Sequence, residues 1–138
     1  MNRDLPAIVV SDWHQNDFQH AFSKAAAGAY MVNLRNGWWD DRNKIIESGM
    51  PSALPIVVIG CLGLVTSEVS EAIESARKHD KQTWGDYNTK DTLVRELAGT
   101  VVRCMDLAER LNLPLASAIV EEIKANAERG YKHGGKAA

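Results

Sequence analysis

The sequence predicts an all-α fold, most simply a four-helix, bundle-like domain. Three observations indicate this class: apolar residues recur every three or four positions, helix-capping residues and glycines stand at segment ends, and no confident strand remains. Because 138 residues suffice for one compact core, we expect a single domain over 1–138. Residues 1–12 form an N-terminal arm in this interpretation, and residues 130–138 a basic, glycine-rich tail.

The first predicted helix begins after a cap at Ser11 or Asp12 and ends near Gly37. Residues 37–55 combine Trp, Asp, Gly and Pro without a clean period, so we expect a loop there, with one short helical turn at 43–48. The inward positions of the first helix follow helical spacing: Phe18, Phe22, Ala25, Ala26, Ala29, Met31 and Val32.

A second helix is predicted from Ala53 to Lys78, around the apolar run at 56–65 (IVVIGCLGLV). That run alone suits a buried strand equally well, but helical spacing of apolar residues continues after it. It has about half the length that a bilayer-spanning helix needs, so we assign it to a protein core. Gly60 and Gly63 either weaken the helix or mark close packing against another one. The inward set is Leu62, Val65, Val69, Ala72, Ile73 and Ala76.

Two further helices complete the prediction. The third begins at a cap on Thr89 or Asp91, and the fourth begins near Pro114 and ends at Gly130. The expected core stripe of the third comprises Leu93, Leu97, Val101, Cys104 or Met105, Ala108 and Leu111. On the fourth, the inward positions are Leu115, Ile119, Ile123 and Ala127.

Charge and cysteine usage limit the function. Sixteen Lys and Arg against eighteen Asp and Glu give a net charge of −2, so polymeric nucleic acid is not an expected partner. Cys61 and Cys104 show no metal-ligand spacing, and the N-terminus has no features of a secretory signal. We therefore expect a cytoplasmic protein that does not enter a membrane.

Acidic residues on the second helix are the first chemical signal. Glu68, Glu71 and Glu74 follow one another in three-residue steps, so Glu68 and Glu71 repel each other unless a cation lies between them. The alternative is a solvated acidic face paired with Arg77 and Lys78.

A polar stripe runs along the third helix through Glu96, Gly99 or Thr100, Arg103 and Asp106. Gly99 stands where a second carboxylate would complete a pair with Glu96, and its alternative role is close helix packing. If this helix packs antiparallel to the second one, the Glu68 and Glu71 pair would face Glu96. Such an oxygen-rich pocket suits a hard cation such as Mg²⁺.

Three segments carry a resemblance to a known family: 64–74 (LVTSEVSEAIE), 96–108 (ELAGTVVRCMDLA) and 126–136 (NAERGYKHGGK). They resemble the MazG-like branch of the all-α nucleoside triphosphate pyrophosphohydrolases, over about residues 37–136. In that family a Glu-x-x-Glu on one helix and a Glu-x-x-Asp on the next bind magnesium. The enzymes split nucleoside triphosphates into the monophosphate and pyrophosphate.

By position, the resemblance implies that Glu68, Glu71 and Glu96 bind Mg²⁺, with Mn²⁺ as a substitute, and act in catalysis. Gly99 departs from the family's aspartate, which implies weaker metal binding and a weakened or inactive enzyme. Glu122 stands where the family tends to have lysine. The resemblance also implies an oligomer-forming MazG-type domain, either a homodimer or a homotetramer, with a house-cleaning role in the nucleotide pool.

Aromatic and basic residues supply the candidate substrate contacts. Trp38 or Trp39 would stack on the nucleobase, or else anchor the core. Asp106, about two turns beyond Gly99, is an auxiliary acid. The candidate groups for binding phosphate are Arg103, Asn126, Arg129, Lys132 and His133, of which those near the C-terminus could equally form an ordinary basic tail.

The sequence therefore leads to three hypotheses. The first is magnesium-dependent hydrolysis of a canonical or modified nucleoside triphosphate to the monophosphate and pyrophosphate. The second is a non-catalytic nucleotide-binding or regulatory protein of the same fold. The third is a purely structural helix bundle whose acidic faces are solvated.

Overall fold

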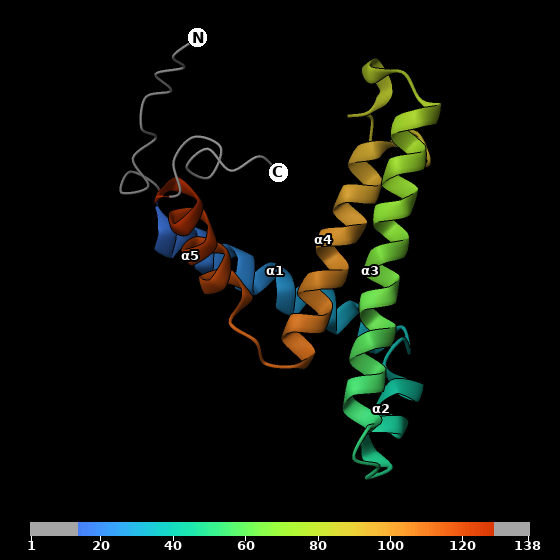
Figure 1. Ribbon diagram of the computed structural model, residues 1–138, viewed down its shortest axis with the longest axis vertical. Coiled ribbons are helices and arrows are strands. Elements are labelled where there is room, and N and C mark those ends of the chain that lie inside the picture. The colour runs from blue at the N-terminus through green and yellow to red at the C-terminus, as the bar shows by residue number, and fades with distance from the viewer. Residues whose placement is uncertain (1–13, 129–138) are drawn as a thin grey trace. The chain divides into compact units, whose positions relative to one another are not determined.

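The structure, a computed structural model, describes residues 14–128 (Figure 1). Within that range it contains helices and no strand, which confirms the predicted all-α class. There are five α-helices instead of four, because the expected turn at 43–48 is part of an eight-residue helix. The elements are α1 (Gln15–Arg35), α2 (Asp40–Glu47), α3 (Ala53–Lys78), the short 3₁₀ helix η1 (Lys81–Thr83), α4 (Leu93–Arg110) and α5 (Leu115–Glu128).

The chain divides into two compact units. One consists of residues 26–113 and contains the end of α1 together with α2, α3 and α4. The other consists of the residues up to 25 and from 114 onward, and its described part is the start of α1 and helix α5. The predicted cap at Ser11 or Asp12 and the predicted stop at Gly130 lie outside the described residues.

Helices α3 and α4 form an antiparallel hairpin, as Figure 1 shows. The bounds of α3 are those predicted, because apolar periodicity continues beyond its apolar run. In the connection, the indole N–H of Trp84 donates to the carbonyl of His79 at 2.9 Å. The predicted cap at Thr89 or Asp91 is wrong: α4 begins after Thr92, whose buried hydroxyl donates to the carbonyl of Asp86. Thr89 instead binds the Asp86 carboxylate.

The apolar core of the 26–113 unit lies around Trp39, which is 1% exposed. The Trp39 ring packs edge-on against Tyr30, with ring centroids 6.0 Å apart. Because α2 has no buried residue of its own, the tryptophan that precedes it provides its anchor. The other buried members of this core are Val57 and Cys61 from α3 and Leu107 from α4.

The predicted inward stripes are wrong in several positions. On α4, Leu97 and Val101 are exposed, whereas Glu96, Asp106 and Leu107 are buried. Helical periodicity locates an apolar stripe but does not identify what covers it, so the orientation of α4 could not be predicted. The other exceptions are exposed residues of α1 (Ala25, Met31 and Val32), α3 (Leu62, Val69, Ile73 and Ala76) and α5 (Ile123 and Ala127, where Ala116 and Val120 are buried instead).

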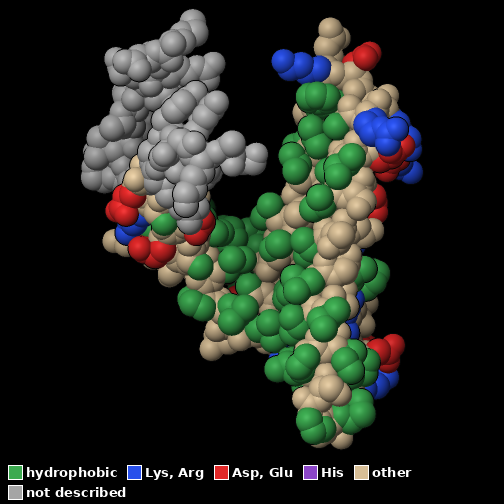
Figure 2. All heavy atoms as spheres, in the orientation of Figure 1, with side chains coloured by type: hydrophobic (Ala, Val, Ile, Leu, Met, Phe, Trp, Pro, Cys, Tyr) green, Lys and Arg blue, Asp and Glu red, His purple; other side chains and the backbone are tan. Residues whose placement is uncertain are grey.

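The apolar run of α3 is only partly in the core. Val57 and Cys61 are buried, but Ile56 and Ile59 are exposed, and hydrophobic side chains follow the hairpin in Figure 2. By length and composition α3 could cross a membrane, since one window has a mean hydropathy of 1.8. Only 17% of that window is buried, whereas a core helix of a soluble protein that passes the same test is mostly buried; a single such helix is weak evidence for a membrane span. A Cβ atom added at Gly60 or at Gly63 would have no neighbouring atom within 4 Å.

Gly37 ends α1 and sets the direction of the two tryptophans that follow. Its φ is +79°, and two hydrogen bonds close the helix end: Gly37 N–H to the Leu34 carbonyl and Trp38 N–H to the Asn33 carbonyl. This is the Schellman pattern, which requires a left-handed residue after the helix. A Cβ at Gly37 would also lie 3.2 Å from Oδ2 of Asp40.

We expect Gly37→Ala to lower the free energy of unfolding by about 1–2 kcal/mol, because an L-residue is strained in the left-handed region. The matched control is Gly28→Ala, within α1, where an added Cβ meets nothing within 4 Å. That change should raise stability by up to about 1 kcal/mol. Urea unfolding of both variants measures the difference, and equal effects would contradict the assigned helix end.

Candidate functional site

A pocket of about 240 Å³ lies between α3, α4 and the segment that joins α1 to α2. Its volume is slightly below the usual range for small-molecule sites, about 300–1,000 Å³. The apolar residues that line the pocket are Cys61, Leu64, Val102 and Leu107. The remaining lining residues are Trp38, Gly99 and the polar or charged Asn33, Arg42, Glu68, Arg103 and Asp106.

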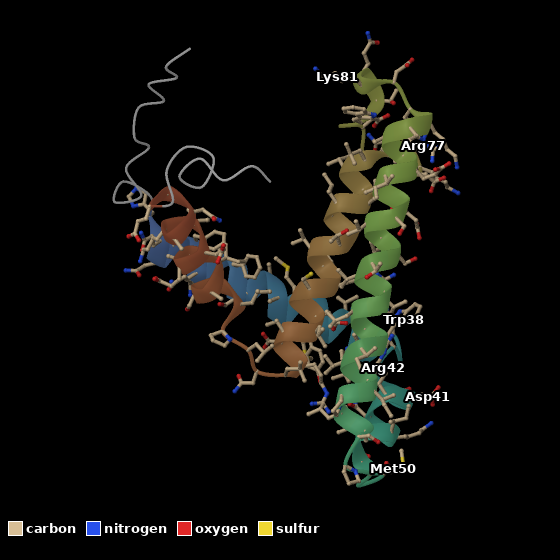
Figure 3. All side chains as sticks on the ribbon, viewed as in Figure 1. Trp38, Asp41, Arg42, Met50, Arg77 and Lys81 are labelled. Carbon is tan, nitrogen blue, oxygen red and sulfur yellow. The ribbon has the colours of Figure 1, made fainter. Side chains whose placement is uncertain are left out.

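The two adjacent tryptophans have different roles. Trp38 is 59% exposed and borders the pocket, so its ring remains available for stacking. Figure 3 shows Trp38 and Arg42 beside α3. The Trp39 ring is in the core, as expected if this tryptophan anchors the core instead of stacking on a nucleobase. Its indole N–H donates to Oδ1 of Asp106 at 2.9 Å. Arg42 also donates to the carbonyl of Trp38 and lies over the Trp39 ring.

Asp106 is buried in the wall of the pocket, and one of its oxygens accepts the Trp39 hydrogen bond. A buried carboxylate without partners would be costly, so the indole stabilises its position. Asp106 was predicted as an auxiliary acid, and the structure places it at the same pocket as Glu68 and Arg103.

Glu68 and Arg103 form an ion pair between α3 and α4. Nε of Arg103 lies 2.6 Å from Oε1 of Glu68, and the Glu68 side chain is 15% exposed. The Glu68 carboxylate lies directly over Gly99: a Cβ built on this glycine would touch it and would be 3.0 Å from its Cδ. In this arrangement Glu68 fills the space that a side chain at position 99 would need.

Glu96 is buried on α4 and faces the acidic residues of α3. Burial raises the pKa of its carboxyl first, and the charges of Glu71, Glu68 and Asp91 raise it further, against an opposing effect of Arg95. The carboxylates of Glu68 and Glu71 therefore lie close enough to Glu96 to act on its charge. Glu71 is exposed and accepts a hydrogen bond from Ser67 at 3.3 Å.

The acidic residues do not form a closed cage. Within residues 14–128, no group of three or more His, Cys, Asp or Glu side chains is placed to hold a metal ion. Of the three predicted ligands, Glu68 lines the pocket and Glu71 and Glu96 are not among its lining residues. Glu74 pairs instead with Arg77 at 3.6 Å and Lys78 at 3.2 Å, as the solvated-face alternative expected.

The remaining phosphate candidates lie elsewhere in the chain. Asn126 is on α5, in the other compact unit, and is exposed. Arg129, Lys132 and His133 lie outside the described residues.

Sequence reasoning missed several lining residues, chiefly Asn33, Arg42 and Cys61. Arg42 is four residues after Trp38 and therefore about one helical turn away from it, a spacing that could have linked the two. Cys61 resembled any small core residue, and it is indeed buried, which raises the pKa of its thiol. No local pattern signalled the Asn33 amide, because its position depends on the turn at the end of α1.

We expect Glu96→Gln to be more stable than the parent protein at pH 7 without divalent metal. A raised carboxyl pKa means that the folded state binds the proton more tightly, so parent stability falls as pH rises above the ordinary value of 4.5. The advantage of the variant should shrink as pH falls toward that value. Urea unfolding between pH 4.5 and 7.5 measures it, with the half-exposed Glu74→Gln as control. A variant less stable than the parent at pH 7 would refute the electrostatic interpretation.

Comparisons with family models, with curated proteins and with solved structures found no match for this chain. A functional proposal therefore depends on the geometry of the pocket and on the sequence blocks that form its walls.

Proposed function

We propose that this protein is a magnesium-dependent nucleoside triphosphate pyrophosphohydrolase that releases pyrophosphate and the monophosphate from a canonical or modified nucleotide. The proposed role is the removal of unwanted nucleotides from the pool. The observation that carries the proposal is the position of Glu68. This glutamate belongs to the block that resembles the family's acidic motif, and it lies in the wall of a pocket that also contains an exposed tryptophan and two arginines.

The donor set supports magnesium in part. Carboxylate oxygens suit this ion. Burial raises the pKa of Glu96 most, and the neighbouring carboxylates raise it further, an effect that a cation would offset. Magnesium commonly uses only one or two protein carboxylates and completes its coordination with water and phosphate oxygens. Glu71 and Glu96 would hold it, joined by Glu68 once that side chain leaves Arg103. When bound, the ion would neutralise phosphate charge and help to activate water.

The side chains of the pocket have complementary tasks in this proposal. Trp38 offers an aromatic face for the nucleobase, where stacking is worth about 1–3 kcal/mol per base. Arg42 and Arg103 supply positive charge for the phosphates, and Asn33 supplies an amide for hydrogen bonding. The protein would then accelerate the reaction through positioning and charge stabilisation.

A second candidate function is nucleotide binding without hydrolysis. Two observations favour it: Gly99 provides no carboxylate, and Glu68 is already paired with Arg103. The same pocket would then bind a nucleotide as a regulatory ligand.

Pyrophosphate release from a panel of canonical and modified triphosphates, with Mg²⁺, tests the proposal. We expect release by the parent protein and an increase on the order of tenfold in Gly99→Asp, because the variant adds a carboxylate to the metal site. Gly99→Asn is the matched control, since it displaces Glu68 by the same bulk without adding charge. An absence of release with every substrate would refute the enzyme hypothesis, and calorimetry with a non-hydrolysable analogue would then detect a binding protein.

We further propose that a second copy of the chain is the partner of the α3–α4 hairpin. Exposed apolar residues form a stripe on each helix of the hairpin, and a soluble protein rarely leaves such a surface uncovered. Two hairpins packed through these stripes would form a four-helix arrangement with two-fold symmetry. The stripes comprise Ile59, Leu62, Val69 and Ile73 of α3 and Leu97 and Val101 of α4.

Sedimentation equilibrium tests this assembly. We expect the parent to be a dimer or tetramer, and Leu62→Lys with Ile73→Lys to shift it to monomer, because buried unpaired charges at an interface are costly. Met50→Lys is the control: Met50 is equally exposed but lies in the connection before α3 (Figure 3). Equal masses for the parent and the double variant would rule out this interface.

A further inference from the structure

The two acidic side chains that line the pocket both have hydrogen-bond partners within the protein. Glu68 accepts a hydrogen bond from Nε of Arg103 at 2.6 Å, and Asp106 accepts one from the Trp39 indole at 2.9 Å. Both carboxylates are also shielded, since the Glu68 side chain is 15% exposed and Asp106 is buried. Each acid therefore has a donor of the protein itself that stabilises its charge.

The donors of the pocket are in the opposite situation. A guanidinium has five N–H groups, of which Arg103 uses Nε on Glu68, and Arg42 uses Nη1 on the carbonyl of Trp38. Within residues 14–128, the other N–H groups of these arginines and the side-chain donors of Asn33 and Trp38 make no hydrogen bond. All four residues line the pocket. The pocket therefore has more donors to offer a ligand than acceptors.

The electrostatics at the pocket wall agree with this count. Burial is the main cause of the raised pKa of the Cys61 thiol, but the charges of Arg42 and Arg103 lower that pKa, and Asp106 raises it. A thiolate at Cys61 would itself be an anion in the wall. The effects on its pKa therefore indicate that two positive groups and one negative group act on an anion placed there.

We propose that the pocket binds the phosphate of a nucleoside monophosphate directly, without a metal ion, through Arg42, Arg103 and the Asn33 amide. Paired phosphate oxygens suit the planar fork of a guanidinium, and an amide N–H₂ adds neutral donors. The ring of Trp38, which is 59% exposed, supplies the face on which the base stacks.

This inference rests on the proposed function for the choice of a nucleotide, and it deepens the regulation of the same site. The monophosphate is a product of the proposed reaction. A pocket that holds the monophosphate without metal would retain this product after pyrophosphate leaves. The product would then compete with the triphosphate, so the accumulated monophosphate would inhibit the protein.

The experiment is calorimetric titration of AMP, GMP, CMP, UMP and dTMP into the parent protein in EDTA. We expect binding of at least one of them. The nucleoside of the same base, which lacks the phosphate, should bind at least about tenfold more weakly, because it leaves both guanidinium groups without a charged acceptor. No binding of any monophosphate in EDTA would overturn the proposal, as would binding that appears only when Mg²⁺ is added.

Variants identify the groups that hold the ligand. We expect Arg42→Gln and Trp38→Leu each to weaken binding of the monophosphate by about tenfold. Only Arg42→Gln should weaken competition by inorganic phosphate, since Trp38 contacts the base. The matched control is Arg95→Gln, because Arg95 lies over the Tyr87 ring and donates to the Tyr87 carbonyl. It loses the same charge outside the pocket, so we expect a change below about threefold.

Arg103 provides a second test if Arg42→Gln folds poorly, since Arg42 lies over the Trp39 ring. Removal of Arg103 also leaves Glu68 without its partner, so Arg103→Gln is combined with Glu68→Gln. We expect this double variant to bind the monophosphate about tenfold more weakly than the parent. Binding equal to that of the parent would mean that Arg103 only neutralises Glu68, and would overturn its role in binding phosphate.

Failure of this inference can be distinguished from failure of the proposed function. Binding of a monophosphate in EDTA without pyrophosphate release by the parent supports direct binding and refutes hydrolysis. Pyrophosphate release by the parent without binding of any monophosphate in EDTA supports hydrolysis and refutes direct binding.

Discussion

The hydrogen bond from the Trp39 indole to the Asp106 carboxylate holds the pocket together. It joins the start of α2 to α4 across 67 residues of sequence, with both partners buried. An isolated helix of the length of α2 is unstable in water, so this helix depends on the Trp39 anchor together with the hydrogen bonds from Arg110 of α4 to Asn43. Trp38 and Arg42 are positioned by the same segment. A change at Asp106 would therefore disturb the aromatic and basic sides of the pocket together.

The α3–α4 hairpin buries carboxylates among its apolar residues and leaves other apolar residues exposed. Glu96 and Asp106 are buried, while Leu97 and Val101 of the same helix are exposed. Burial of carboxylates costs free energy that their partners only partly repay. Association through the outer stripes would offset that cost, because apolar burial contributes about 25 cal/mol per Å². The proposed assembly would thus compensate for the free energy that burial of the pocket carboxylates costs.

Local patterns predicted the helices, and long-range contacts account for most of what they missed. The bounds of α3 followed from the spacing of apolar residues along a single helix. The pairing of Glu68 with Arg103 could not be predicted, because it depends on the register between two helices. The separate roles of Trp38 and Trp39 could not be predicted either. Adjacent residues point in different directions, and the turn at Gly37 determines which of the two is buried.

Cys61 gives the pocket an unreactive sulfur. Its thiol is buried in the wall and its pKa is raised by that burial, so little of the nucleophilic thiolate exists at neutral pH. Alkylating reagents that enter the pocket would therefore modify this sulfur slowly. A ligand bound in the pocket would slow the reaction further, so the rate of Cys61 alkylation measures how often the pocket is empty and accessible.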